Sequence, residues 1–298
     1  MSFFVYFCIF IVILFTYIHV NYQYKKSEDL EIYEMDYVSN EHLQTICNVK
    51  QPVLFQHPLF ENIQLLNETR AKENTEINIW DTNDYYKSPG DASVSPVVLS
   101  FSAAERLFKT DPQGHYYTEK NRTFFEENGI HVPVAADPVL RPNFTVNSAH
   151  DLIKGSAKTC IPLRYHTLDR KFVSVISGKI TVKMTPWRSH VFLNPVKDYG
   201  TYEFYSRLNP WNCPPEYKND MDKIRFLEFD VLSGYTLYIP PYWWYSVQLS
   251  STDTVVIGCE YQTAANVLAN SPDIIKHYIQ IHNTKRVQVR TLENVITI

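Results

Sequence analysis

Hydrophobic and polar positions change their pattern twice along the chain. Residues 3–20 form an almost unbroken apolar run, and residues 25–45 are polar and acidic. From about residue 158, short alternating or apolar runs are separated by turns that contain Gly or Pro. Many short strands without intervening helices predict a sandwich or barrel of the jelly-roll kind.

The first apolar run predicts a membrane anchor over residues 1–24. A helix of 18 residues reaches roughly 27 Å, which is enough to cross the hydrocarbon core of a bilayer. A cleaved signal peptide is the alternative, but no basic residue precedes the run and no small-x-small cleavage site follows Val20. Lys25 and Lys26 lie directly after the run. We therefore expect a single-pass protein whose body lies on the cytoplasmic side.

Between the anchor and the strand-rich part we expect a polar stalk over residues 25–45 and a strand and helix elaboration over residues 46–150. In the elaboration, Ser102 and Glu105 have the spacing of a helix capping box. The core is expected over residues 151–263, with a helical tail over residues 264–298. Further expected elements are a strand at 50–56, a short helix at 121–130 ended by Gly129, and two C-terminal helices broken near Pro272.

The composition of the chain limits which classes of function we expect. The chain has 298 residues, a net charge of −4 and no cluster of basic residues, so nucleic-acid binding is not expected. The counts of 21 Tyr and 17 Phe favour strands. Outside the anchor, the four cysteines occur without a C-x-x-C motif, which favours free thiols over disulfides or a zinc site. They are Cys47, Cys160, Cys213 and Cys259, and three sequons begin at Asn67, Asn121 and Asn143.

Two stretches of the strand-rich part carry a more specific pattern. Residues 175–187 read VISGKITVKMTPW, and residues 237–247 read LYIPPYWWYSV. Together they resemble the cupin-like, JmjC-type Fe(II)/2-oxoglutarate dioxygenases, a family whose core is a double-stranded β-helix. The resemblance covers about residues 150–263 and implies the same fold here, with flanking helices. In that family two histidines and one carboxylate hold Fe(II) and leave positions open for oxoglutarate and oxygen.

The metal ligands of the family do not carry over onto this chain. The late histidine of the family corresponds to Tyr245, and the early His-x-Asp corresponds to Arg164 and His166. The oxoglutarate-binding lysine corresponds to Ile180. A guanidinium has no lone pair to offer a cation, and its charge repels Fe(II). We therefore predict a catalytically inactive binding or structural module that needs no cofactor, held at a membrane.

Other residues are expected around the degenerate site. Arg164 is predicted to pair with Asp169 or Glu260. His166 is interpreted as a lone polar residue at the barrel mouth, and the tryptophans are expected to pack the core and rim. The residues predicted to line a pocket are Tyr165, Asp169, Lys179, Lys183, Trp243 and Trp244.

Several alternatives stay open. An active Fe(II)/2-oxoglutarate-dependent hydroxylase or demethylase would need His166, Asp169 and either His150 or His190 to converge. A sugar-binding or anion-binding pocket would use Arg164, Tyr245 and the tryptophans. Expected partners are the bilayer, through residues 3–20, and proteins of unknown identity. The resemblance also allows homodimerisation through residues 264–282. A membrane-anchored, catalytically inactive barrel would suit a structural protein of a membrane-containing virion.

Overall fold

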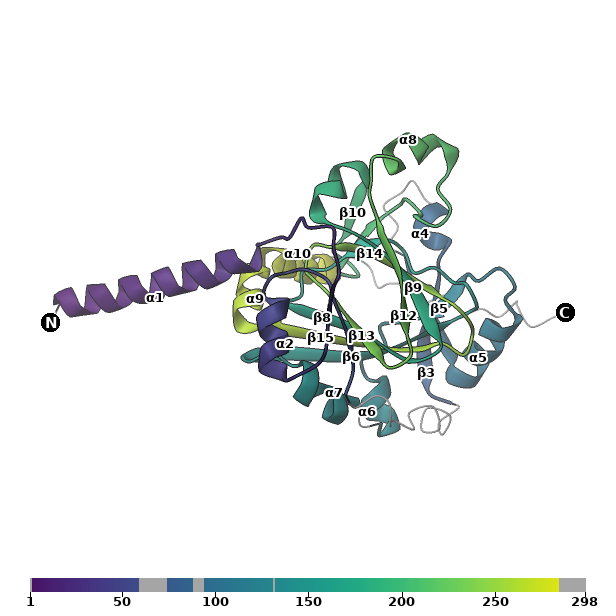
Figure 1. The fold of residues 1–298 in the computed structure, drawn as a ribbon, viewed down its shortest axis with the longest axis horizontal. Coiled ribbons are helices and arrows are strands. Elements are labelled where there is room, and N and C mark those ends of the chain that lie inside the picture. Colours follow the sequence, from purple (N-terminus) through teal and green to yellow (C-terminus); the bar gives the residue numbers. More distant parts are fainter. Residues whose placement is uncertain (1, 59–73, 88–93, 131, 284–298) are drawn as a thin grey trace.

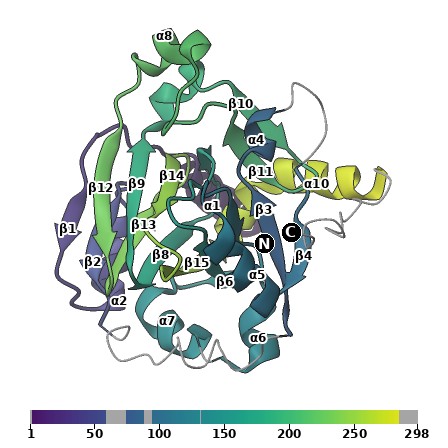
Figure 2. The same ribbon diagram turned by 90° about the vertical axis from the view of Figure 1, so that its right-hand side faces the viewer.

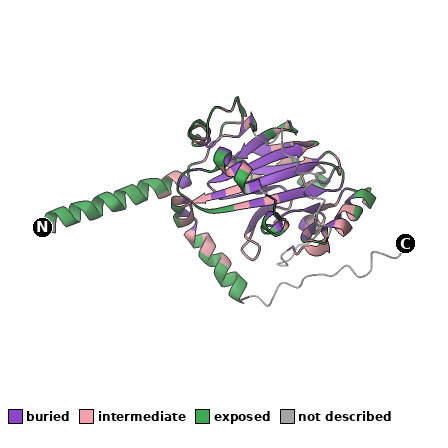
Figure 3. Cartoon of the chain, turned by 90° about the horizontal axis from the view of Figure 1, so that it is seen from below, coloured by how far each residue is buried: buried purple, intermediate pink, exposed green. Residues whose placement is uncertain are grey.

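The computed structural model describes residues 2–58, 74–87, 94–130 and 132–283. Its first helix, α1 (Ser2–Gln23), stands away from the rest of the protein over most of its length and is exposed from Phe3 to His19, whereas Gln23 at its end is buried (Figures 1 and 3). The stretch Phe3–Gln23 has a mean hydropathy of 2.5 and none of its most apolar window is buried. Helix α1 is therefore long and apolar enough to span a membrane.

The remaining described residues form a mainly-β body, which confirms the predicted fold class at this level. Within the described part of the chain the strands make a nine-stranded and a six-stranded sheet. The larger sheet has the order β1-β2-β13-β8-β15-β6-β5-β3-β4 and the smaller has the order β10-β11-β7-β14-β9-β12. The strands of the larger sheet are β1 (Tyr33–Met35), β2 (Val53–Gln56), β3 (Glu76–Asp81), β4 (Val97–Ser100), β5 (Tyr116–Thr118), β6 (Thr145–Gly155), β8 (Arg170–Ser177), β13 (Tyr235–Ile239) and β15 (Val255–Thr263). Those of the smaller sheet are β7 (Arg164–Tyr165), β9 (Lys179–Thr185), β10 (Pro195–Asp198), β11 (Glu203–Ser206), β12 (Leu227–Leu232) and β14 (Trp244–Leu249).

The two sheets pack face to face, and strand periodicity explains how. Successive side chains of a strand point to opposite faces, so a strand buried on both sides serves two cores. On β8, Val173 and Val175 belong to the cluster between the sheets, where they join Ile180 and Val182 of β9. Phe172, which directly precedes Val173, belongs to the cluster on the outer face of the larger sheet.

Helices cover that outer face (Figures 1 and 2). They contribute buried side chains such as Leu43, Phe101, Phe124 and Ala136 to the outer cluster. The helices of the body are α2 (Asn40–Cys47), α4 (Asp84–Lys87), α5 (Phe101–Thr110), α6 (Phe124–Asn128), α7 (Val132–Leu140), α8 (Lys218–Met221), α9 (Ala264–Ala269) and α10 (Ser271–Asn283), with 3₁₀ turns at Trp187–Phe192 and Pro215–Tyr217.

The region expected to be a polar stalk packs on the body instead. Strand β1 pairs in parallel with β2, and Leu43 of α2 is fully buried. Lys26 lies 4.1 Å from the ring centroid of Trp187, and Glu28 accepts a hydrogen bond from the backbone N–H of Arg188. Alternating apolar residues within this acidic stretch, rather than its net charge, decide its location.

The helix boundaries follow local signals with one correction. Gly129 ends α6 in the left-handed conformation, with φ of 67°, as predicted. The break near Pro272 is confirmed, because α9 ends at Ala269 and α10 begins at Ser271. The predicted cap of α5 was wrong: Ser100, not Ser102, accepts a hydrogen bond from the N–H of Ala103. The first core strand, β6, starts at Thr145 rather than near 151.

Candidate functional site

The aromatic segment 238–248 consists of the end of β13, a tight turn and most of β14. The N–H of Trp243 donates to the carbonyl of Pro240 at 3.3 Å. Pro241 and Tyr242 are the central residues of this turn, and Tyr242 has a φ of 67°. Proline followed by a residue with positive φ is the pattern of a type II turn.

This turn is joined to the end of β7. The N–H of Tyr242 donates to the carbonyl of His166 at 2.9 Å. His166 Nε2 in turn lies 3.0 Å from the carbonyl oxygen of Ile239. Immediately after the turn, Tyr245 of β14 is the register partner of Arg164 on β7. The three predicted site residues, Arg164, His166 and Tyr245, therefore come together.

They line a cavity of about 670 Å³. Tyr165 also lines it, as predicted. The wall carries four acidic and four basic side chains together with several aromatic rings. The charged lining residues are Glu119, Lys120, Arg122, Asp151, Arg164, Lys171, Glu203 and Glu260.

Arg164 lies at the centre of a buried ion-pair network. Its Nη2 contacts a carboxylate oxygen of Glu119, and its Nη1 lies 3.2 Å from Oε1 of Glu203. Lys120 Nζ lies 2.8 Å from the same Glu203 oxygen. Burial acts to raise the pKa of Glu203, but Lys120 and Arg164 outweigh it and hold that pKa below its ordinary value. These contacts correct the predicted pairing of Arg164 with Asp169 or Glu260.

A second ion pair completes the wall. Lys171 Nζ lies 2.6 Å from Oε1 of Glu260. Burial opposes the charge of both groups, yet the pair keeps the pKa of Glu260 down at about 2 and raises that of Lys171. The ring of Tyr245 lies between two cations, 5.6 Å from the guanidinium carbon of Arg164 and 5.8 Å from Lys171 Nζ. Such contacts stabilise a cation beside a ring.

His166 is neutral in this environment. Burial, with Lys171 nearby, lowers its pKa to about 3. Its ring centroid lies 6.1 Å from that of Tyr245. Nδ1 of His166 is buried and has no hydrogen-bond partner within the described residues. The cavity wall therefore combines these ion pairs with the uncharged imidazole of His166.

Asp169 lies outside this lining, which corrects its predicted place. Its carboxylate accepts from Lys50 Nζ at 3.3 Å and from Arg170 Nη1 at 3.2 Å. Lys50 is fully buried there, and burial lowers its pKa to about 8. Asp169 lies in the loop between β7 and β8, where these two cations bind it.

The other four predicted pocket residues also lie outside the cavity lining. Lys179 and Lys183 alternate with the buried Ile180 and Val182 on β9 and point outward. Trp243 and Trp244 are buried in two different apolar clusters, which agrees with the core packing expected for them. Lys179 pairs with Asp230 at 2.8 Å, and Lys183 pairs with Glu228 at 3.4 Å. Trp243 packs between the sheets, whereas Trp244 packs with Leu163 and Phe204.

The alternative ligand set does not converge. His150 Nε2 lies 3.1 Å from a carboxylate oxygen of Asp137, and His190 stacks on Trp187 at 4.8 Å between ring centroids. Asp169 binds Lys50, as described above. In the described part of the chain, no group of three or more His, Cys, Asp or Glu residues is arranged to hold a metal ion.

Sequence reasoning missed the acidic partners of Arg164 and the role of Lys171. Glu119 follows β5 and Glu203 begins β11, so neither lies in the two stretches that carry the resemblance. The available signal was an acidic residue directly before two aromatic residues, as in EFYS at 203–206. A buried charge of this kind requires a partner.

No family model matches this chain, and no curated protein is significantly similar to it.

Proposed function

We propose that the body is a double-stranded β-helix that serves, at a membrane, as a catalytically silent binding or structural module. Its fold is supported by the strand order. Within the larger sheet the contiguous run is β13-β8-β15-β6, and within the smaller it is β7-β14-β9-β12. These eight antiparallel strands in two facing sheets have the number and arrangement of a jelly roll.

The observation that carries the functional proposal is the position of Arg164. In the resemblance it occupies the place of the first metal ligand, and its strand partner, Tyr245, occupies the place of the last. Arg164 binds two buried carboxylates, so its guanidinium is an integral part of the wall. A buried ion network of this kind is costly to disrupt.

The residues do not fit Fe(II) and 2-oxoglutarate. A guanidinium offers no lone pair, so Arg164 cannot bind a metal ion. The two remaining positions are held by His166 and Tyr245, and neither side chain is a carboxylate. The position of the oxoglutarate-binding lysine is held by Ile180, which is fully buried in the apolar core. We therefore derive no step through an iron centre.

The membrane anchor is supported by how α1 joins the body. Tyr22 donates to the carbonyl of Asn48 at 2.5 Å, and Tyr24 donates to that of Ala269 at 2.5 Å. Gln23 accepts from the side chain of Asn266 at 3.2 Å. Contacts of this specificity at the end of the helix favour a retained anchor over a leader that is removed. An anchored module of this kind suits a protein of a membrane-containing particle such as a virion.

Metal binding by the full chain in detergent tests the silent site. We expect anaerobic titration with Fe(II), with and without 2-oxoglutarate, to give no stoichiometric binding. The matched control is the triple variant Arg164→His, His166→Asp and Tyr245→His, which restores the donor set on the same strands and should gain the metal. Stoichiometric Fe(II) binding by the unmodified chain, strengthened by 2-oxoglutarate, would overturn the proposal.

Retention of the anchor is tested separately. The intact mass of the protein purified from membranes should include residues 2–23, and alkaline carbonate should leave it in the membrane fraction. A mature chain that begins after Gln23 contradicts the anchor but leaves the silent site unaffected.

A further inference from the structure

The end of α1 is held against two parts of the body, so the body lies close to the membrane edge. Val20 is the last residue of the apolar run, and Gln23 lies about 5 Å beyond it along a helix. Tyr22 binds α2 through Asn48, whereas Gln23 and Tyr24 bind α9. Helix α10 begins two residues after α9 ends. The proposed anchor therefore brings α10 to the bilayer surface.

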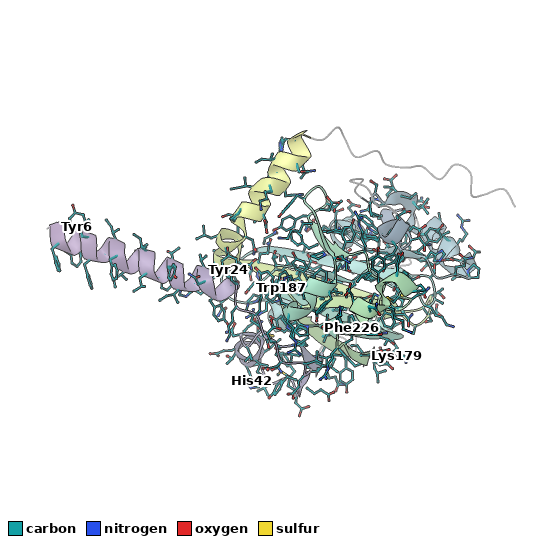
Figure 4. All side chains as sticks on the ribbon, turned by 90° about the horizontal axis from the view of Figure 1, so that it is seen from above. Tyr6, Tyr24, His42, Lys179, Trp187 and Phe226 are labelled. Carbon is teal, nitrogen blue, oxygen red and sulfur yellow. The ribbon has the colours of Figure 1, made fainter. Side chains whose placement is uncertain are left out.

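Helix α10 runs across the direction of α1. Figures 3 and 4, which view the molecule from opposite sides, show it leaving the end of α1 and extending to one side of the α1 axis. This is the orientation of a helix that lies in the plane of a membrane when α1 crosses it.

One side of α10 binds the body. Asp273 accepts from Tyr199 Oη at 3.0 Å, and His277 Nδ1 lies 2.6 Å from the carbonyl oxygen of Tyr199. Ile274 lines the cavity beside them. Residues at this spacing of three and four share a helix face.

The opposite side of α10 is apolar and exposed. Ile275 and Ile279 lie four residues apart and are 56% and 55% exposed. Tyr278 flanks them and is exposed as well. Leu268 on α9 and Val49 beside the Tyr22 contact add exposed apolar side chains at the same end of the body.

We propose that α10 lies in the head-group region of the bilayer that α1 spans, with Ile275 and Ile279 directed toward the acyl chains. This inference rests on the proposed membrane anchor. The surrounding side chains suit a lipid surface: exposed Lys25 can meet lipid phosphates, and Tyr24, Tyr278 and Trp187 supply amphipathic rings of the type enriched at membrane interfaces. The bilayer would thereby fix the orientation of the cavity, because Ile274, His277 and Tyr278 of α10 line it.

Site-specific fluorescence on the full chain tests this. The background carries Cys8→Ser, Cys160→Ser and Cys213→Ser, since Cys47 and Cys259 are buried. A bimane probe is attached at Ile279→Cys, or at Lys276→Cys on the polar side as the matched control. The protein is reconstituted in vesicles of phosphatidylcholine and phosphatidylglycerol, with or without lipid that carries a nitroxide on its acyl chain.

We expect the nitroxide to quench the probe at position 279 several-fold more than the probe at 276. Equal or absent quenching at both positions would overturn the proposal. A blue-shifted probe at 279 that the nitroxide does not quench, but that transfers energy to a second labelled copy, would assign the face to a protein partner and also overturn it.

A third variant that retains only Cys8 among the accessible cysteines separates this outcome from failure of the anchor. Quenching at Cys8 without quenching at 279 leaves the anchor in place and refutes the position of α10. Loss of quenching at both refutes the anchor together with the inference that rests on it.

Discussion

Arg164 and Tyr245 face one another across neighbouring antiparallel strands, with the guanidinium carbon 5.6 Å from the centroid of the phenol ring. The pair stands where the resemblance to dioxygenases requires two metal ligands. The guanidinium of Arg164 contacts the carboxylates of Glu119 and Glu203. Under the proposed function, this guanidinium supplies the positive charge that a metal ion supplies in the dioxygenases.

Replacing Arg164 should therefore be severely destabilising. Arg164→Ala leaves two buried carboxylates without this partner, and we expect a loss of about 3–5 kcal/mol in the free energy of unfolding. Thermal unfolding of the full chain in detergent, followed by tryptophan fluorescence, measures it.

Lys179→Ala is the matched control for Arg164→Ala, because Lys179 and its partner Asp230 are exposed. It should cost less than about 1 kcal/mol. Adding Glu119→Gln and Glu203→Gln to Arg164→Ala should recover part of the loss. Equal costs for the Arg164 and Lys179 variants would show that the buried network contributes no more than a surface pair.

His166 should make the protein less stable in mild acid. Its native pKa of about 3 lies below the ordinary value of about 6.5, so between these values the unfolded chain binds a proton that the native chain does not. This contribution is fully present above pH 6.5 and is lost, at up to about 1.4 kcal/mol per pH unit, as the pH falls toward 3.

The variant His166→Gln isolates that contribution. Asp151, whose pKa burial and Glu119 raise to about 7, acts with the opposite sign in the same range, and His57, with a pKa lowered to about 4 by burial, acts with the same sign. Both remain in the variant, so the difference between the two stability curves from pH 6.5 to 5 reports His166 alone. Parallel curves would mean that His166 titrates normally.

The positions of the cavity residues along the chain explain which of them can be predicted from the sequence. The juxtaposition of Arg164, His166 and Tyr245 follows from local motifs whose strands pair within the core. Glu119 and Glu203 lie 45 and 39 residues from Arg164 and reach it through β5 and β11, which pair with β6 and β7 just outside the eight strands described above. No local pattern encodes which strands pair with β5 and β11. The same reason explains the mistaken stalk, because β1 gains its place only by pairing with β2.

The turn before Tyr245 should depend on the backbone conformation of Tyr242. Its φ of 67° favours glycine, while its ring packs against Trp187 at 5.5 Å and Tyr165 at 6.3 Å between centroids. Tyr242→Ala loses the ring and keeps the strain, whereas Tyr242→Gly loses the ring and relieves the strain. We expect the alanine variant to be less stable than the glycine variant by about 1 kcal/mol, measured by thermal unfolding. The reverse order would indicate that the turn relaxes away from positive φ.

The side of the membrane on which the body lies can be determined from Asn143. This sequon asparagine is exposed in the turn before β6, whereas Asn121 is buried and donates to Thr118 Oγ1 at 2.8 Å, and Asn67 lies outside the described residues. Lys25 and Lys26 predict a cytoplasmic body, so the chain expressed in a eukaryotic cell should show no endoglycosidase-sensitive mass. The control directs the same body to the lumen with a cleavable leader in place of α1, where Asn143 should become modified and Asn143→Gln should abolish that modification. Glycosylation at Asn143 in the unaltered chain would place the body, its cavity and α10 on the lumenal face.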